Sequence, residues 1–170
     1  SLGVLAFYAI NRAAQAGWAP ILFRVMEGIT GYLPVGALIF FVLLVLSGLH
    51  LNHLFIWMDP QVVAHDTVIQ GKTAYLNVPF FLIRTAIYLL GWIGYRQITR
   101  RLSKAQGQAS DNRPFVKAFK WSAGFLVFFL VTESMMSWDW IMGLDPHWFS
   151  TLFGWYVFSS FITASIAALI

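Results

Sequence analysis

The sequence contains no cysteine and few charged residues. The absence of cysteine among its 170 residues excludes disulfides and thiolate-ligated Fe–S clusters within the chain. Charged residues make up 11% of the chain, whereas soluble domains usually carry about a quarter. So few charges cannot cover a water-facing surface, and the composition therefore excludes an ordinary soluble domain.

Hydrophobic residues make up 59% of the chain and are concentrated in long runs. Residues 35–58 contain no Lys, Arg, Asp or Glu, and neither do residues 148–170. Each run exceeds the roughly 20 residues that a helix needs to cross about 30 Å of hydrocarbon. Neither run alternates with the period of two that a barrel strand requires. The sequence therefore predicts an all-α fold, a polytopic transmembrane helix bundle.

The pattern predicts one transmembrane helical domain over residues 1–170, with about four full spans. We place these spans at about 34–57, 78–95, 115–137 and 148–170, with a partial span at 1–10 and a short interfacial helix at 17–32. No signal-peptide pattern precedes the first apolar run. Because both ends fall within hydrophobic runs, we expect the chain to be an incomplete part of a longer protein.

Charge asymmetry predicts the orientation of the spans. The basic residues Arg96, Arg100, Arg101, Lys104, Arg113, Lys117 and Lys120 surround the loop 104–114, against Asp111 alone. The loops 58–77 and 138–147 instead hold four Asp and one Lys. Because cytoplasmic loops carry an excess of Lys and Arg, we expect loop 104–114 to be cytoplasmic and the other two loops to be periplasmic.

Ionisable residues inside a membrane are costly and therefore mark candidate functional sites. The predicted topology gathers His50, His53, Arg84, Glu133 and Asp139 into one layer near the periplasmic surface. His50 and His53 are three residues apart, so a continuous helix would place them on one face. A layer of His, carboxylate and Arg is typical of proton-coupled chemistry, for example accepting the two hydroxyl protons of a quinol.

We accordingly predict that His50, His53, Glu133 and Asp139 handle quinol or its protons. The predicted quinone pocket or proton route consists of Arg84, His147, Trp138 and Trp140. The sequence suggests no metal site, because haem ligation would need histidines at matched depth on two helices.

Each candidate also has a simpler structural interpretation. Arg84 and Glu133 can neutralise each other across two helices, as intramembrane charges usually do. His50 and His53 can serve as hydrogen-bonding residues between helices, and Trp138 and Trp140 can belong to an interfacial aromatic belt.

Three segments carry a resemblance to a known family. Residues 137–151 (SWDWIMGLDPHWFST) resemble a signature of the NrfD/polysulfide-reductase-like membrane subunits of bacterial alternative complex III. Residues 48–53 (GLHLNH) and 75–84 (YLNVPFFLIR) are similar to the same family, and the whole chain looks most like its F-type subunit.

The resemblance implies a multi-pass subunit of a quinol:cytochrome c, or other high-potential acceptor, oxidoreductase in the bacterial inner membrane. It implies a paralogous NrfD-like subunit, haem c and Fe–S subunits and quinol as partners, with the redox centres on the partner chains, and no nucleic acid. It also implies two four-helix bundles, of which this chain covers about half. The F-type subunit is associated with a proton route or scaffolding, and its C-type paralogue with quinol oxidation.

Two alternatives remain open at the level of sequence. One is a structural membrane anchor without a quinone site, which would tolerate neutral substitutions in the polar layer. The other is an ion or proton transporter, which would place polar groups through the whole membrane depth, whereas the cytoplasmic half of these spans contains few.

Overall fold

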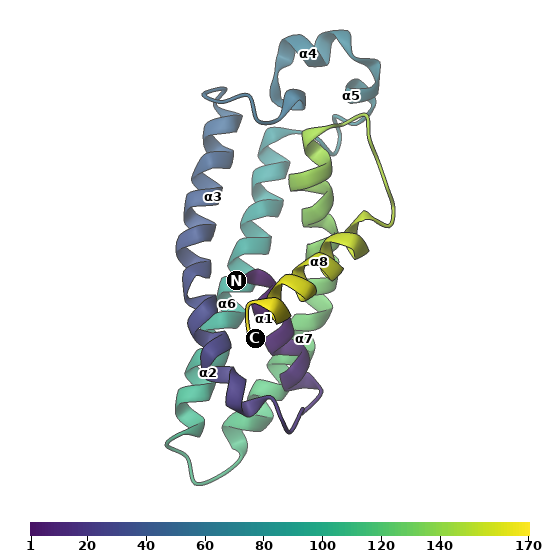
Figure 1. The fold of residues 1–170 in the computed structure, drawn as a ribbon. Coiled ribbons are helices and arrows are strands. Elements are labelled where there is room, and N and C mark those ends of the chain that lie inside the picture. Colours follow the sequence, from purple (N-terminus) through teal and green to yellow (C-terminus); the bar gives the residue numbers. More distant parts are fainter.

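The computed structural model describes residues 1–170 as an entirely helical chain without β-strands (Figure 1). Its α-helices are α1 (Leu2–Ala13), α2 (Pro20–Ile29), α3 (Leu33–Gly48), α4 (Pro60–His65), α5 (Thr67–Gly71), α6 (Val78–Gln106), α7 (Arg113–Met136) and α8 (Phe153–Ala167). Short turns of 3₁₀ or π type lie at Thr30–Tyr32, Ile56–Met58, Ser137–Ile141 and Met142–Leu144. The predicted all-α fold is confirmed.

Three helical segments are long and apolar enough to cross a membrane. They are Pro20–Gly48 and Val78–Gln106, each of 29 residues, and Arg113–Leu144, of 32 residues. A helix of 29 residues is about 43 Å long, which exceeds the roughly 30 Å of the hydrocarbon core. These segments indicate a membrane protein, as the composition predicted.

The predicted separate helix at 17–32 is wrong in its bounds, because α2 continues through a 3₁₀ turn into α3. Pro34 lies in the first turn of α3 and has no N–H to donate to the preceding turn. The 3₁₀ turn at Thr30–Tyr32 accommodates this missing bond, so one helical segment runs from Pro20 to Gly48.

The predicted end of this first span at residue 57 is also wrong, since α3 ends at Gly48. The amide of Leu51 donates to Leu46 O, and the amide of His50 donates to Ser47 O, each at 3.0 Å. His50 has a φ of 58°, the left-handed conformation of a residue that ends a helix in a Schellman motif. The chain therefore turns away from the helix axis at His50.

The third span extends beyond its predicted end. A π turn at Ser137–Ile141 and a 3₁₀ turn at Met142–Leu144 carry the helix of α7 to Leu144. The segment 138–144, predicted to be a loop, is therefore helical, and the connection to α8 begins at Asp145. By contrast, α8 has 15 residues and is about 22 Å long. It is too short to confirm the predicted span at 148–170.

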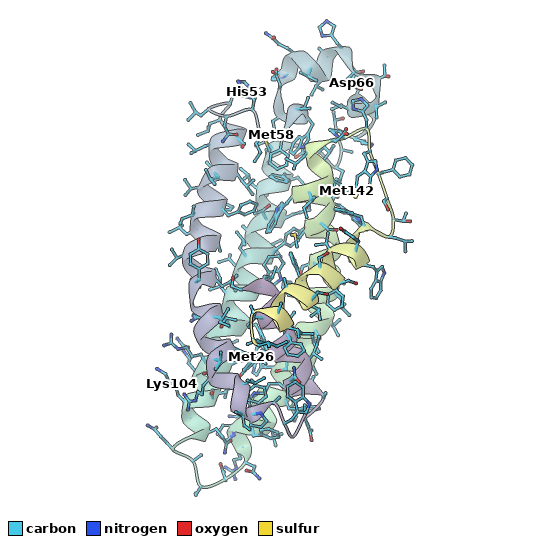
Figure 2. The ribbon with its side chains drawn as sticks, viewed as in Figure 1. Met26, His53, Met58, Asp66, Lys104 and Met142 are labelled. Carbon is cyan, nitrogen blue, oxygen red and sulfur yellow. The ribbon has the colours of Figure 1, made fainter.

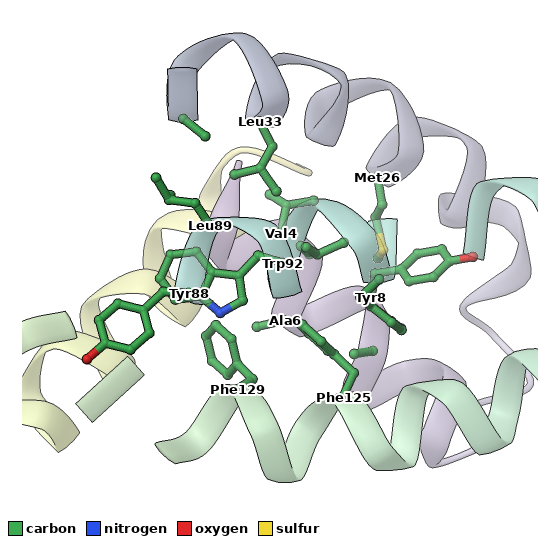
Figure 3. Packing of buried hydrophobic residues seen from close by; sticks show 14 of the residues in the cluster. Val4, Ala6, Tyr8, Met26, Leu33, Tyr88, Leu89, Trp92, Phe125 and Phe129 are labelled. Carbon is green, nitrogen blue, oxygen red and sulfur yellow. The ribbon is translucent and has the colours of Figure 1, made fainter. Parts of the chain in front are cut away.

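The main core lies where α1 packs against α6 and α7. Figure 3 shows Tyr8 of α1, Tyr88 and Trp92 of α6, and Phe125 and Phe129 of α7 around this contact. Close packing of this kind, rather than the hydrophobic effect, is what holds helices together in lipid. In contrast, α3 exposes many apolar side chains, as expected of a surface that faces lipid or another subunit.

Candidate functional site

The two ends of the bundle differ in charge and in the segments that form them. At one end, the connections 49–77 and 145–152 meet; we call this the acidic end. At the opposite, basic end, the turn 107–112 joins α6 to α7. Figure 2 shows His53 and Asp66 at the acidic end and Lys104 at the basic end. The candidate site lies at the acidic end.

A buried ion pair joins α6 to the π turn that follows α7. Arg84 Nη2 lies 2.8 Å from Asp139 Oδ1, and Arg84 Nε donates to Asp139 Oδ2 at 2.9 Å. The two side chains are 4% and 0% exposed. This two-bond geometry matches the planar guanidinium to the carboxylate and is the strongest form of such a pair.

Aromatic residues complete the surroundings of the pair. Tyr88 Oη donates to Asp139 Oδ2 at 3.0 Å, and Arg84 Nη1 donates to Tyr75 O at 3.1 Å. The Arg84 guanidinium also lies 3.9 Å from the ring centre of Tyr75 and 4.2 Å from that of Phe80. Rings at this distance stabilise a cation from which water has been removed.

Local helix geometry explains why these residues meet. Arg84 and Tyr88 are four residues apart on α6 and therefore lie on one face. Asp139 lies in the π turn, where one extra residue per turn changes the direction in which side chains point. Turns of this type are frequent at functional sites.

The hydroxyl of Tyr75 is buried and has no hydrogen-bond partner within the chain. Burial and the nearby Asp139 carboxylate raise the pKa of Tyr75 above its ordinary value. The hydroxyl therefore keeps its proton at neutral pH.

A cleft of about 370 Å³ opens beside this network, between the two connections of the acidic end. Its walls include Tyr75 on one side and Trp138, Met142, Trp148 and Phe149 on the other. Tyr75 belongs both to the cleft and to the surroundings of Arg84. The cleft is mostly apolar and aromatic with a few polar groups, as small-molecule sites usually are.

The two predicted tryptophans have different surroundings. Trp138 is 40% exposed and lines the cleft. Trp140 is half-buried, donates from Nε1 to Thr85 Oγ1 at 3.0 Å and packs edge-on against Phe40 at 4.6 Å between ring centres. Trp140 therefore joins α3, α6 and the π turn, while Trp138 is available to a ligand.

Glu133 is 2% exposed, and its Oε1 has no hydrogen-bond partner. It lies on α7, six residues before Asp139, and forms no ion pair. The possible pairing of Arg84 with Glu133 is therefore wrong, because Asp139 takes the guanidinium. A buried carboxyl group without a partner is costly to keep ionised and is suited to carrying a proton.

His50 and His53 do not share a helix face, contrary to prediction. Both follow the end of α3 and are exposed, and the first is in the left-handed conformation. Neither has a hydrogen bond or ion pair from its side chain to the buried Arg84–Asp139 network. The sequence suggested a longer helix because no charge interrupts the run through residue 58.

His147 lies on the surface of the acidic end and holds its two connections together. Its Nε2 is 2.7 Å from Oδ2 of Asp66, whose other oxygen accepts the amides of Val68 and Ile69 at the start of α5. Lys72 Nζ donates to the carbonyl oxygen of residue 146 at 2.5 Å. Partial desolvation opposes the effect, but the two amides and His147 lower the pKa of Asp66 overall.

The sequence did not identify Tyr88, Tyr75 or Asp66 as site residues. The position of Tyr88, four residues after Arg84, was a usable signal for a shared helix face. The roles of Tyr75 and Asp66 depend on how the connection 49–77 folds back over the bundle, for which no short-range pattern exists.

Comparison with known proteins does not identify the chain: no protein-family model matches it, and no curated protein matches its sequence.

Proposed function

We propose that this chain is an NrfD-like membrane subunit of a quinol-oxidising respiratory complex in the bacterial inner membrane. In this proposal the acidic end faces the periplasm and binds quinol, accepts its protons, or does both. The supporting observation is the buried Arg84–Asp139–Tyr88 network beside an aromatic cleft. Electrons would pass to haem c and Fe–S clusters on partner subunits.

The chemistry of a quinol fits the groups around the cleft. Trp138 and Trp148 offer ring faces against which a quinol ring can pack. Tyr75 lines the same cleft, and its protonated hydroxyl is buried near Asp139, next to the ion pair. Glu133 lies outside the lining of the cleft, six residues before Asp139, and its unpartnered carboxyl oxygen suits a group that accepts a proton and passes it on.

The geometry of the ion pair also favours a second candidate, a structural anchor. Both oxygens of Asp139 are engaged within the chain, Oδ1 by Arg84 and Oδ2 by Arg84 and Tyr88. A fully paired carboxylate can act purely as a link between helices. In that case the cleft would bind no quinol.

Quinol oxidation by the purified complex distinguishes the two candidates. We expect Trp138→Leu to raise the KM for quinol roughly tenfold, equivalent to about 1.4 kcal/mol of binding. The matched control is Trp155→Leu on α8, which is 64% exposed and lies outside the cleft. Haem content of the partner subunits reports assembly. Equal KM values in both variants would exclude quinol binding in this cleft and leave the anchor and the proton route.

Glu133→Gln tests the proton route separately. This change removes the titratable group and keeps nearly the same shape, so we expect kcat to fall at least tenfold with KM unchanged. Unchanged kcat in an assembled complex would remove Glu133 from the mechanism.

A further inference from the structure

The basic end carries positive charge that the chain itself does not neutralise. Nine of the eleven Lys and Arg residues lie there, all except Lys72 and Arg84, against the two acids Glu27 and Asp111. One ion pair forms at this end, between Arg113 and Asp111. The only side-chain partner of Glu27 is the hydroxyl of a tyrosine on α1, at 3.3 Å. The remaining cations are available to an anionic ligand.

Helix lengths place this charge at the depth of lipid headgroups. About 20 residues of helix cross the hydrocarbon core. If α6 enters the core at its first residue, Val78, it leaves the core close to Arg96. About 20 residues before Gly48, the last residue of α3, the same helical segment reaches the level of Thr30. Arg96 and Arg100 thus lie where the hydrocarbon ends, at the level of the phosphates on that side.

A small cleft between α1, α2 and α6 brings donors together at this depth. It is lined by Tyr8, Glu27, Thr30, Arg96, Thr99 and Arg100, and its volume of about 10 Å³ accommodates a single oxygen atom. Arg96 Nε is buried there without a hydrogen-bond partner. An unpaired buried donor is costly, so a ligand oxygen that accepts from it would bind favourably.

A second arginine beside this cleft, Arg12, is buried and forms no ion pair. Arg12 is 8% exposed, donates from Nε to Tyr8 Oη at 3.2 Å and lies 4.1 Å above the ring centre of Phe23. Its charge adds to the positive potential around Arg96. Glu27 is the one acid in the cleft and is outnumbered by Arg12, Arg96 and Arg100, so the positive charge that remains favours an anion.

An apolar groove continues from this cleft along the membrane-spanning part of α3 and α6. It has a volume of about 410 Å³ and is lined by Pro34, Ala37, Leu38, Phe41, Ala86, Leu89, Leu90 and Ile93. Pro34 follows Thr30 by one helical turn, and Ile93 precedes Arg96 by three residues, so the groove begins next to the cleft. A polar site joined to an apolar groove has the shape of a lipid, whereas a free phosphate would leave the groove unused.

We propose that the basic end binds an anionic phospholipid, with its phosphate at Arg96 and Arg100 and an acyl chain in the groove between α3 and α6. Lipid headgroups are bound by basic pockets between transmembrane helices in this way. The proposal does not depend on quinol binding at the opposite end.

Native mass spectrometry of the full-length protein in detergent tests the proposal, with phosphatidylglycerol and phosphatidylcholine as probes. Because one basic residue near an anionic headgroup contributes roughly fivefold in affinity, Arg96→Gln and Arg100→Gln should each weaken phosphatidylglycerol binding about fivefold. The matched control is Arg101→Gln, which removes the same charge from the same helix outside the cleft. Equal losses in Arg96→Gln and Arg101→Gln would mean diffuse surface attraction and overturn the proposal.

Two further arms test the lipid itself. Ala86→Phe fills the groove and should weaken phosphatidylglycerol binding, whereas Ile87→Phe, on the exposed neighbouring face, should not. Equal binding of both lipids, or displacement of phosphatidylglycerol by an equal concentration of inorganic phosphate, would overturn the assignment to an anionic lipid. Circular dichroism must show that each variant keeps its helical content. If Arg96→Gln does not fold, Arg100→Gln, at an exposed residue, provides the test.

Discussion

Removing the negative charge of Asp139 should destabilise the protein far more than removing the whole ion pair. Asp139→Asn keeps the shape of the side chain but leaves the guanidinium of Arg84, which is 4% exposed, without a counter-charge. For charges about 4 Å apart, an effective dielectric constant of about 20 corresponds to about 4 kcal/mol of lost attraction. Breaking a buried pair from one side typically costs about 3–5 kcal/mol.

The double variant Arg84→Met/Asp139→Leu removes both charges together and leaves neither uncompensated. We expect it to cost no more than about 2 kcal/mol, because apolar pairs of similar volume replace buried ion pairs at little cost. The assay is reversible unfolding in mixed detergent micelles, followed by circular dichroism. As a control, Asp145→Asn makes the same chemical change at a site that is 70% exposed and should leave the unfolding midpoint unchanged.

Two results would refute this reasoning. A loss below about 1 kcal/mol in Asp139→Asn would mean that water or another group reaches Arg84 and shields its charge. A double variant as unstable as the single one would mean that packing around the pair, rather than its charge, holds α6 to the π turn.

Three other predictions concern different parts of the molecule. The pKa of Asp66 is lowered, so the contacts of its carboxylate stabilise the fold above the ordinary value near 4 and are lost as the pH falls through the lowered value. Hydrogen exchange in α5 should accelerate in that acidic range, and acceleration already at pH 6 would contradict this. Asp66→Asn should keep the cap of α5 but lose the carboxylate that faces His147. Gly3→Leu should detach α8, because even a Cβ at Gly3 would lie 2.5 Å from Phe161 O. The unfolding midpoint should therefore fall, and an unchanged midpoint would disprove the prediction. Trp140→Phe removes the half-buried hydrogen bond to Thr85 and should lower the free energy of unfolding by about 1 kcal/mol in the same assay. An equal loss in the exposed control Trp155→Phe would show that the hydrogen bond is not the cause.

The sequence was most informative where one physical rule acts over a long stretch. The runs without charge predicted membrane-spanning helices, and the clustering of basic residues predicted which loops share an end. The contacts that join the 49–77 and 145–152 connections, such as Lys72 with the carbonyl of residue 146, agree with that grouping. Which end faces the periplasm stays a prediction.

The candidate site was predicted in part. Arg84 and Asp139 were both identified from their cost inside a membrane, and they contact one another. Their pairing was not predicted, because 55 residues separate them and Glu133 was an equally plausible partner by depth. The π turn decided the choice by turning Asp139 toward α6, and no sequence rule specifies such a turn.

By itself, the sequence determined the fold class, the apolar segments and the ionisable residues whose burial in a membrane costs free energy. It could do so because hydrophobicity and charge are properties of single residues. Only the tertiary structure decided where α3 ends, which carboxylate Arg84 binds, and that His50 lies outside the network. Those outcomes depend on backbone hydrogen bonds at helix ends and on packing between segments far apart in the chain. The same holds at the basic end, where the cleft beside Arg96 exists only because α1, α2 and α6 meet there.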